Sequence, residues 1–205
     1  YYITMEKVGL PGEGRVFKNS NEALMAYQRR EIKLQTRIAI PVNSFKHKVF
    51  LDEDKNKYLV TTPGKIIFNE ILPDSFPYLC ESTSENIEGF TPSKYFIDYG
   101  ENIPELISNM PLSTPFNKGA LEKIIAQMFK RYKTTETSIF LDKLKDLGFK
   151  YSTFSGITIA ASDVVVSKNK HAVIEKSNEE IKKVNKQFQR GLITCLLYTS
   201  PSPRD

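Results

Sequence analysis

The stretch that decides the fold is residues 141–166, with the sequence LDKLKDLGFKYSTFSGITIAASDVVV. Leu141, Leu144 and Leu147 recur at helical spacing, and Gly148 follows where a helix C-cap glycine is expected. The β-branched run at residues 157–159 predicts a strand, and Asp163 with the valines after it leads into a long charged helix. By pattern alone, this stretch is a helix–turn–strand crossover.

Length and composition are those of a globular protein. The chain has 205 residues, of which 40% are hydrophobic and 26% charged, enough for one core or two small domains. Its apolar runs are shorter than the roughly 20 residues that span a bilayer, so we expect no membrane contact. The opening YYITMEK has neither an initiator methionine nor a signal-peptide pattern, and we expect the sequence to be excised from a longer one.

Charge and cysteine content narrow the class only slightly. The net charge of +5 is dispersed along the chain, which suits nucleic-acid contact and an ordinary solvated surface equally well. Cys80 and Cys195 stand alone, so no zinc site is predicted, and two lone cysteines fit a reducing cytoplasm.

The first 60 residues predict a short helix and a small antiparallel β-meander. Asn19 or Ser20 caps the helix, and its buried face is Ala23, Leu24 and Tyr27. Residues 35–42 alternate as a half-buried strand, with Gln35 and Arg37 on the face away from the core. Residues 48–51 and 57–61 flank a polar loop and predict a hairpin.

Helices dominate the rest of the chain. Thr61, Thr62 and Pro63 form a helix-start signal, and Pro73 ends the short helix that follows. An amphipathic helix is then expected from its apolar stripe, and residues 134–137 break it and cap the next one; the stripe is Leu121, Ile124, Ile125, Met128 and Phe129.

The last helix carries a heptad seam. Its apolar or small residues alternate at spacings of three and four, with Lys and Glu outside; they are Ile174, Ser177, Ile181, Val184, Phe188 and Gly191. Such a seam requires a second helix to cover it. The predicted fold class is therefore α+β: a small antiparallel β-meander plus helices, ending in a long coiled-coil-type helix.

Catalytic motifs are missing from the sequence. His47 and His171 have no neighbouring nucleophile, and no HExxH, GxxxxGK[ST] or GxSxG occurs. Asp142 and Asp163 fit a helix surface and a turn or cap better than a site. We therefore predict no catalytic, cofactor-binding or metal-binding residue in this chain.

Four ordered blocks carry a resemblance. They are EGRVFKNSNEALMAY at 13–27, TTPGKIIFNEILP at 61–73, GFKYSTFSGITIAASDVVV at 148–166 and QFQRGLIT at 187–194. Together they resemble the largest catalytic subunit, beta-prime, of bacterial DNA-dependent RNA polymerase. Family members usually carry arginine where this chain has Lys65, which keeps the charge but loses the bidentate geometry.

The resemblance implies a domain layout. Residues 1–60 correspond to the β-rich segment just after the catalytic barrel, and 61–166 to the pore region. Within it, residues 78–112 depart from the family wording and are expected to be a surface insertion. Residues 167–194 correspond to the first rim helix of the funnel. Residues 195–205, which lack a seam and contain helix breakers, are expected to be a non-native tail.

The implied function is a part of template-directed RNA synthesis. This piece would form the wall of the nucleotide-entry channel and the docking rim for transcription factors. The channel-lining candidates are Lys65, Ser155, Gly156, Thr158 and Asp163, and the factor-docking candidates are Lys182, Lys186, Gln189 and Arg190. The family's metal-binding motif NADFDGD is not in this sequence, so the piece alone is expected to be inactive.

The resemblance also implies partners. These are the beta, alpha, omega and sigma subunits, the DNA template, RNA, nucleoside triphosphates and secondary-channel factors, in a cytoplasmic enzyme. The full enzyme would use Mg²⁺, and zinc in another domain, but no cofactor is expected in this piece. A rival interpretation from another class is a stand-alone interaction module with a projecting coiled-coil arm and no catalytic activity.

Overall fold

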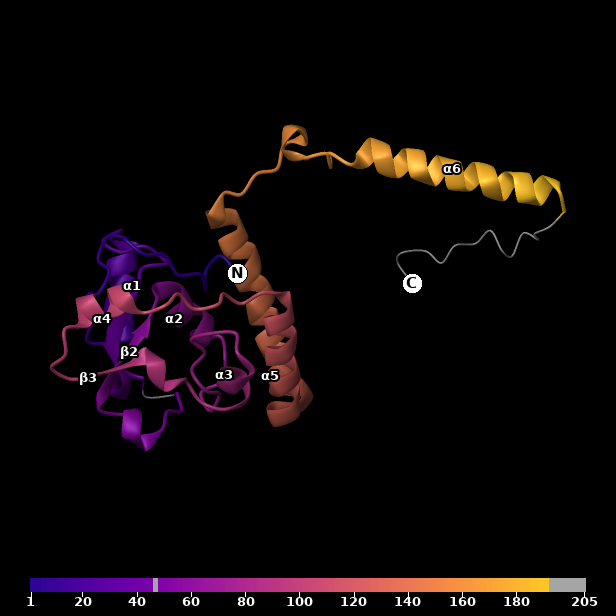
Figure 1. Ribbon diagram of the computed structural model, residues 1–205. Coiled ribbons are helices and arrows are strands. Elements are labelled where there is room, and N and C mark those ends of the chain that lie inside the picture. Colours follow the sequence, from indigo (N-terminus) through magenta and orange to yellow (C-terminus); the bar gives the residue numbers. More distant parts are fainter. Residues whose placement is uncertain (46–47, 192–205) are drawn as a thin grey trace. The chain divides into compact units, whose positions relative to one another are not determined.

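The computed structural model describes residues 1–45 and 48–191. The chain divides into two compact units, Tyr1–Ile157 and Thr158–Asp205. The first holds a three-stranded sheet and the helices labelled in Figure 1, and the second holds the long helix α6, so the α+β class is confirmed. The strands are β1 (Ile38–Pro41), β2 (Lys57–Thr61) and β3 (Phe96–Asp98), and the helices are α1 (Ser20–Gln28), α2 (Pro63–Glu70), α3 (Ser84–Glu88), α4 (Ile103–Asn109), α5 (Lys118–Ser155) and α6 (Lys170–Gln189).

The sheet is antiparallel in the order β1-β2-β3. Ile40 lies opposite Leu59 in one pair, and Tyr58 lies opposite Ile97 in the other. The predicted hairpin between residues 48–51 and 57–61 is wrong, because β2 is the central strand and both its edges are taken by β1 and β3. Val49 makes only an isolated bridge to Pro77.

Strand β1 is shorter than predicted, and its polar flank is not solvated. Gln35 and Arg37 are both buried, against the prediction that they point away from the core. Arg37 donates two hydrogen bonds to Glu13, of 2.8 and 2.6 Å, and one of 2.9 Å to the Met110 carbonyl. These partners offset the cost of burying a guanidinium, which alternation alone does not predict.

Residues 78–112 do not lie only on the surface, because part of the segment enters the core. They supply β3, and Tyr78, Ile97 and Ile107 are 0–3% exposed. Asn86 ties this segment together, since its amide donates to the Tyr78 carbonyl and its oxygen accepts from the Cys80 amide at 2.8 Å. The segment thus has internal hydrogen bonds of its own and completes the sheet.

The predicted starts of helices α1 and α2 are confirmed. Asn19 caps α1 by accepting the Glu22 amide at 2.9 Å, and Thr62 caps α2 by accepting the Lys65 amide at 3.2 Å. Gly64, two residues after Thr62, permits a close approach, because a β-carbon there would lie 1.8 Å from the Ile3 carbonyl oxygen. Residues 1–4 therefore pack directly on α2.

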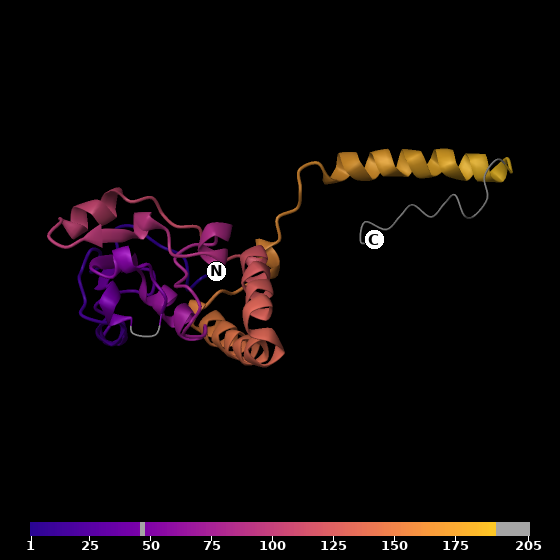
Figure 2. The same cartoon turned by 90° about the horizontal axis from the view of Figure 1, so that it is seen from below.

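Helix α5 bends and then runs longer than expected (Figure 2). The predicted break near residues 134–137 is confirmed, with non-helical backbone at Lys133. Ile124 and Met128 are buried as predicted, whereas Phe129 is 55% exposed. The prediction of a C-cap at Gly148 is wrong: the stripe of Leu144 and Leu147 continues one turn to buried Tyr151, so the helix is held until residue 155.

After α5 the predicted strand at residues 157–159 does not form. No strand pairs with it in the described part of the chain, and Ile157 and Ile159 are 75% and 84% exposed. A short 3-10 turn, Ala161–Asp163, follows. The long helix is confirmed as α6, and its seam residues Ile174 and Ile181 are 46% and 56% exposed.

Candidate functional site

Four predicted channel-lining residues follow one another where α5 ends. Gly156 closes the helix in the left-handed conformation, with φ of 63°, which glycine adopts without strain. Ser155 donates 2.7 Å to the Ser152 carbonyl within the last turn. Beyond it, Thr158 is exposed, and the Asp163 carboxylate accepts the Ala160 amide at 2.8 Å. Asp163 is thus a turn-capping residue with a solvent-exposed carboxylate.

The same stretch exposes an unusual amount of apolar surface. Ile157, Ile159 and Val165 are 75%, 84% and 91% exposed, and Phe154, in the last turn of α5, is 67% exposed. Large apolar side chains clustered on a surface mark contact sites with other molecules or segments. This stretch therefore has the composition of a contact surface with polar residues between the apolar ones.

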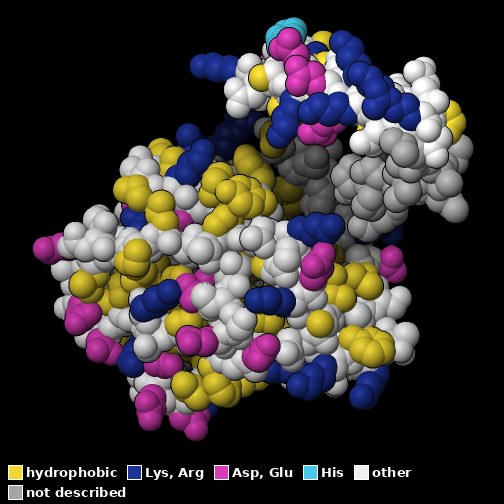
Figure 3. Space-filling model, turned by 45° about the vertical axis from the view of Figure 1, so that its right-hand side comes forward, with side chains coloured by type: hydrophobic (Ala, Val, Ile, Leu, Met, Phe, Trp, Pro, Cys, Tyr) yellow, Lys and Arg dark blue, Asp and Glu magenta, His cyan; other side chains and the backbone are white. Residues whose placement is uncertain are grey.

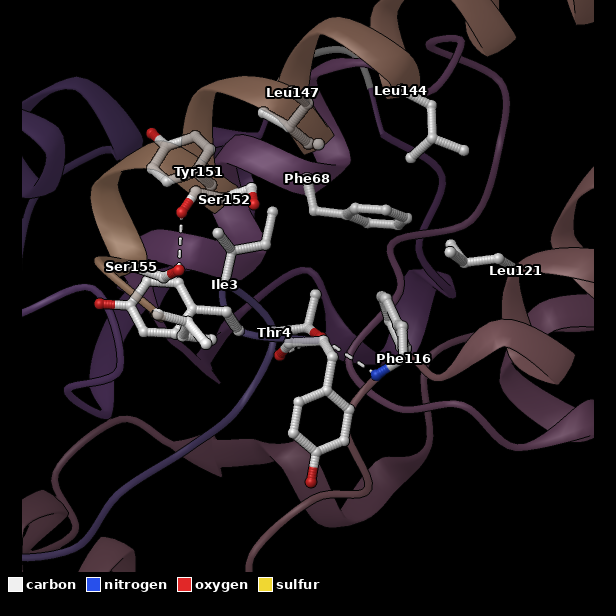
Figure 4. A pocket seen from close by; sticks show the side chains of 14 residues that line it. Ile3, Thr4, Phe68, Phe116, Leu121, Leu144, Leu147, Tyr151, Ser152 and Ser155 are labelled. Atoms are coloured by element: carbon white, nitrogen blue, oxygen red, sulfur yellow. Dashed lines mark hydrogen bonds between the residues drawn. The ribbon is translucent and has the colours of Figure 1, made fainter. Parts of the chain in front are cut away.

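An apolar pocket of about 320 Å³ lies beside the end of α5 (Figure 4). Leu121 comes from the first half of α5, Leu144 and Leu147 from the second, and Phe68 from α2. Residues 1–4 close another side, where Thr4 accepts the Phe116 amide at 3.0 Å. Ser155 belongs to the polar part of the lining, so the predicted site residue lies beside a cavity of ligand-binding size.

The structure places Lys65, the fifth channel-lining candidate, in the interior of the N-terminal unit. Its ammonium is completely buried, pairs with the Glu6 carboxylate and donates 2.7 Å to Ser113. The Tyr95 ring centroid lies 5.5 Å from its Nζ, so a cation–π contact completes the surroundings. A lysine at this position therefore makes a carboxylate contact within the chain, without the bidentate geometry of arginine.

Glu6 belongs to the same buried group and was missed by sequence reasoning. Burial raises the pKa of its carboxyl, but the Lys65 charge and hydrogen bonds from Lys65 and Ser113 outweigh burial and hold the pKa below 4.5. Glu6 lies 59 positions before Lys65 and 107 positions before Ser113, so no local sequence pattern predicts its pairing with them.

A second buried acid lies on the far side of Tyr95. Glu81 accepts 2.7 Å from the Tyr95 hydroxyl and forms an ion pair with Lys94 at 2.6 Å. Burial raises the pKa of Tyr95, and its bond to Glu81 adds to that rise, so the phenol stays protonated. Cys80 is fully buried, and burial raises its thiol pKa to about 12, which makes it unreactive.

The predicted docking residues lie on the C-terminal half of α6 and just after it. Lys182, Lys186 and Gln189 are exposed helical residues, and Arg190 is the C-cap. Lys and Arg side chains line this helix in Figure 3. Residues 192–205, which include Cys195 and the expected non-native tail, lie outside the described residues, as does His47.

Among residues 1–45 and 48–191, no group of three His, Cys, Asp or Glu side chains is arranged to hold a metal ion. In the same residues, no helix is both long and apolar enough to span a membrane. The buried charges are engaged with one another, while the exposed stretch after α5 and the basic face of α6 are available for contacts.

The structure defines the class of protein: an α+β domain with apolar core clusters, buried ion pairs and exposed apolar residues after α5. Residues 1–164 match the family RNA polymerase Rpb1, domain 3, and the chain belongs to that family. It is 52% identical over 194 residues to the DNA-directed RNA polymerase subunit beta' of Bacillus licheniformis, 50% to that of Bacillus subtilis and 54% to that of Geobacillus kaustophilus. In each case the match covers 95% of this chain and 16% of the relative. This family membership favours the polymerase interpretation over the interaction module.

Proposed function

We propose that this chain is part of the beta' subunit of a bacterial, cytoplasmic DNA-directed RNA polymerase, and that it forms wall and rim of the channel through which nucleoside triphosphates reach the active site. The observation that carries the proposal is the match of residues 1–164 to the Rpb1 domain 3 family, with about half of the aligned residues identical to beta' subunits over 95% of the chain.

In this proposal the stretch after α5 lines the channel. Ser155, Gly156, Thr158 and Asp163 present small or polar groups without a cationic side chain among them. Such a wall passes triphosphates without trapping them, because a strong fixed positive charge would hold an anion in place. The exposed Ile157, Ile159 and Val165 would be covered by the other parts of the polymerase.

Helix α6 would form the docking rim for secondary-channel transcription factors. Lys182, Lys186 and Arg190 offer a basic surface, and Gln189 adds a neutral hydrogen-bonding group. Such a surface suits an acidic partner, since exposed charges steer association more than they set affinity. The catalytic Mg²⁺ and the zinc of the whole enzyme would be held elsewhere in the beta' subunit, and the beta, alpha, omega and sigma subunits, template DNA and RNA would be partners of that whole.

A chimeric polymerase tests the proposal. The matching segment of the Bacillus subtilis beta' subunit is replaced by residues 1–191 of this chain, and the subunit is assembled with its native partners. We expect an assembled enzyme that transcribes, and the Ile97→Asp version serves as a matched chimera whose inserted core cannot fold. If the unaltered segment supports no more transcription than the Ile97→Asp segment, the proposal fails.

The docking role has its own test. In the working chimera, Lys182→Glu together with Lys186→Glu is expected to weaken the effect of secondary-channel factors while factor-free transcription is unchanged. Lys130→Glu with Lys133→Glu, two exposed lysines of α5, is the control for the change in charge. Equal effects from both pairs would rule out docking on α6.

A further inference from the structure

Three tyrosines and two cations from distant parts of the N-terminal unit line one groove of about 370 Å³. Tyr2 comes from the first segment, Tyr27 from α1, and Tyr151 from the end of α5, with Phe154 one turn further on. Arg30 and Lys33, which follow α1, line the same groove. This volume lies within the range of small-molecule sites.

The aromatic part offers flat surfaces and neutral hydroxyl groups. The rings of Tyr151 and Phe154 lie with their centroids 5.9 Å apart at 53°. Burial raises the pKa of Tyr27, with Tyr2 adding to the rise, and burial raises that of Tyr151, with Tyr27 and Glu70 adding to it. The hydroxyls of Tyr27 and Tyr151 therefore stay protonated at neutral pH, so they can donate as well as accept hydrogen bonds.

The two cations keep their charge available. Arg30 and Lys33 are exposed, and neither forms an ion pair with an acid in the described part of the chain. Glu31, the acid between them, is bound instead to Arg15 at 3.1 Å. An anion in the groove would therefore meet two positive charges that no acid among the described residues neutralises.

Arg30 occupies a position where glycine is ordinarily found. The Arg30 amide donates to the Tyr27 carbonyl at 2.9 Å and the Glu31 amide to the Ala26 carbonyl at 3.0 Å, which is a Schellman C-cap. Arg30 accordingly has φ of 62°, a conformation that costs a residue with a β-carbon free energy. Strain of this kind, held beside a groove, points to a use for the side chain.

We propose that this groove binds a nucleoside phosphate, with the base against the aromatic rings and the phosphates at Arg30 and Lys33. Aromatic platforms beside basic side chains are the common means of holding single-stranded nucleotides without reading their sequence. The ligand is either a free nucleoside triphosphate or the end of an RNA strand, since both present the same base and phosphate. The inference deepens the proposed function and takes the source of its ligand from it, but the groove lies within this chain and is tested by binding alone.

The test is fluorescence anisotropy of a 5′-labelled short oligouridylate on the 205-residue chain at several salt concentrations, with UTP and inorganic triphosphate as competitors. We expect binding that UTP displaces better than inorganic triphosphate does. Displacement by UTP identifies a free nucleotide as a sufficient ligand, and oligouridylate binding that UTP cannot displace identifies the strand end. No binding of either, or equal competition by inorganic triphosphate, overturns the proposal.

Matched variants locate the site. Arg30→Gly removes the guanidinium and relieves the strained backbone, so its unfolding midpoint should be equal or higher. Its binding should weaken, with the slope of log affinity against log salt reduced by about 0.7. Lys133→Gly is the control, because Lys133 is the other described cation at positive φ and lies outside the groove. Equal weakening by both variants would show diffuse charge attraction and refute the site.

The aromatic contribution is tested on one helix. Phe154 and Phe149 are 67% and 71% exposed in α5, but only Phe154 lines the groove. Phe154→Leu should weaken binding roughly fivefold or more, the low end of the loss of one stacking contact, and Phe149→Leu should leave it unchanged. If Phe154→Leu binds as the wild type does, the base does not stack there. Unchanged binding in Arg30→Gly and Phe154→Leu, together with a working chimera, would refute the groove and leave the channel role standing.

Discussion

At the scale of residues, the N-terminal unit is organised around a buried ion pair. Glu6 and Lys65, 4% and 0% exposed at their side chains, connect the first segment to α2, and Ser113 connects both to the chain before α5. A buried pair of this kind adds little net stability over apolar residues, but removing one partner leaves an unpaired charge in the interior. The pair therefore fixes which segments meet.

The first prediction concerns that charge. Glu6→Gln should lower the free energy of unfolding by about 3 kcal/mol, because Lys65 is left buried without a counter-charge. Urea unfolding of the 205-residue chain measures it. The double variant Glu6→Gln with Lys65→Met removes the stranded ammonium and should recover most of the loss; a double variant as unstable as Glu6→Gln would show that the charge is not the cause.

The pH dependence of this effect follows from the lowered pKa of Glu6. A carboxyl whose folded pKa lies below its ordinary value of 4.5 contributes stability that is complete above pH 4.5 and is lost as the pH falls through the folded value. The gap in unfolding free energy between wild type and Glu6→Gln should therefore shrink as the pH drops below 4.5. A gap that stays constant throughout the acid range would contradict the pairing.

Residue-scale signals could be read from sequence only when they were local. Asn19 and Thr62 cap helices by accepting amides three residues away. The break at Lys133 lies next to the threonines from which it was predicted. The partners of Glu6 could not be predicted, because no sequence pattern distinguishes a solvated glutamate from one that pairs with a lysine 59 residues later.

At the scale of elements, the main surprise is the segment 78–112. Its content of Ser, Asn, Glu and Pro is typical of a loop. In the structure, however, Asn86 forms hydrogen bonds with the backbone of the segment, and apolar residues of the segment enter the core. Composition records how polar a segment is but not where its hydrogen bonds go. The third strand could not be predicted for this reason.

The second prediction tests that segment. Ile97→Ala in β3 should cost about 2–5 kcal/mol of unfolding free energy, because it opens a cavity at a side chain 3% exposed. Phe90→Ala, 45% exposed in the same segment, should change it by less than about 0.5 kcal/mol. Chemical denaturation of both variants is the measurement. An Ile97→Ala chain as stable as the wild type would show that β3 does not contribute to the core.

At the candidate site, the sequence did not predict the local structure. The glycine at 156 and the β-branched residues after it were read as a turn and strand, whereas they form a helix cap and an exposed extended run. A strand requires a neighbour for its hydrogen bonds, and none is present for residues 157–159 within the described residues. The β-branched composition is explained as well by contacts outside the chain as by a strand within it.

At the scale of the whole molecule, α6 should make the isolated chain associate. Ile174 and Ile181 lie on the heptad seam and are 46% and 56% exposed, so pairing of two chains would bury them. Sedimentation velocity should show association that increases with concentration and is abolished by Ile174→Asp with Ile181→Asp. Val173, which is 61% exposed and lies off the seam, provides the control variant Val173→Asp. A chain that is monomeric at all concentrations would contradict the predicted pairing through the heptad seam.

The most direct test of the channel wall uses the chimeric polymerase with Thr158→Cys. The thiol is modified with a bulky anionic reagent, and the rate of nucleotide addition is measured at limiting nucleoside triphosphate. Background from Cys80 is small, because that thiol is fully buried with a pKa of about 12. Ser138→Cys, exposed on α5, is the control. The account predicts that modification of the thiol at position 158 slows nucleotide addition several-fold and that a high nucleotide concentration restores the rate. Modification at position 138 should have no effect. An unchanged rate after modification at position 158 would contradict the account.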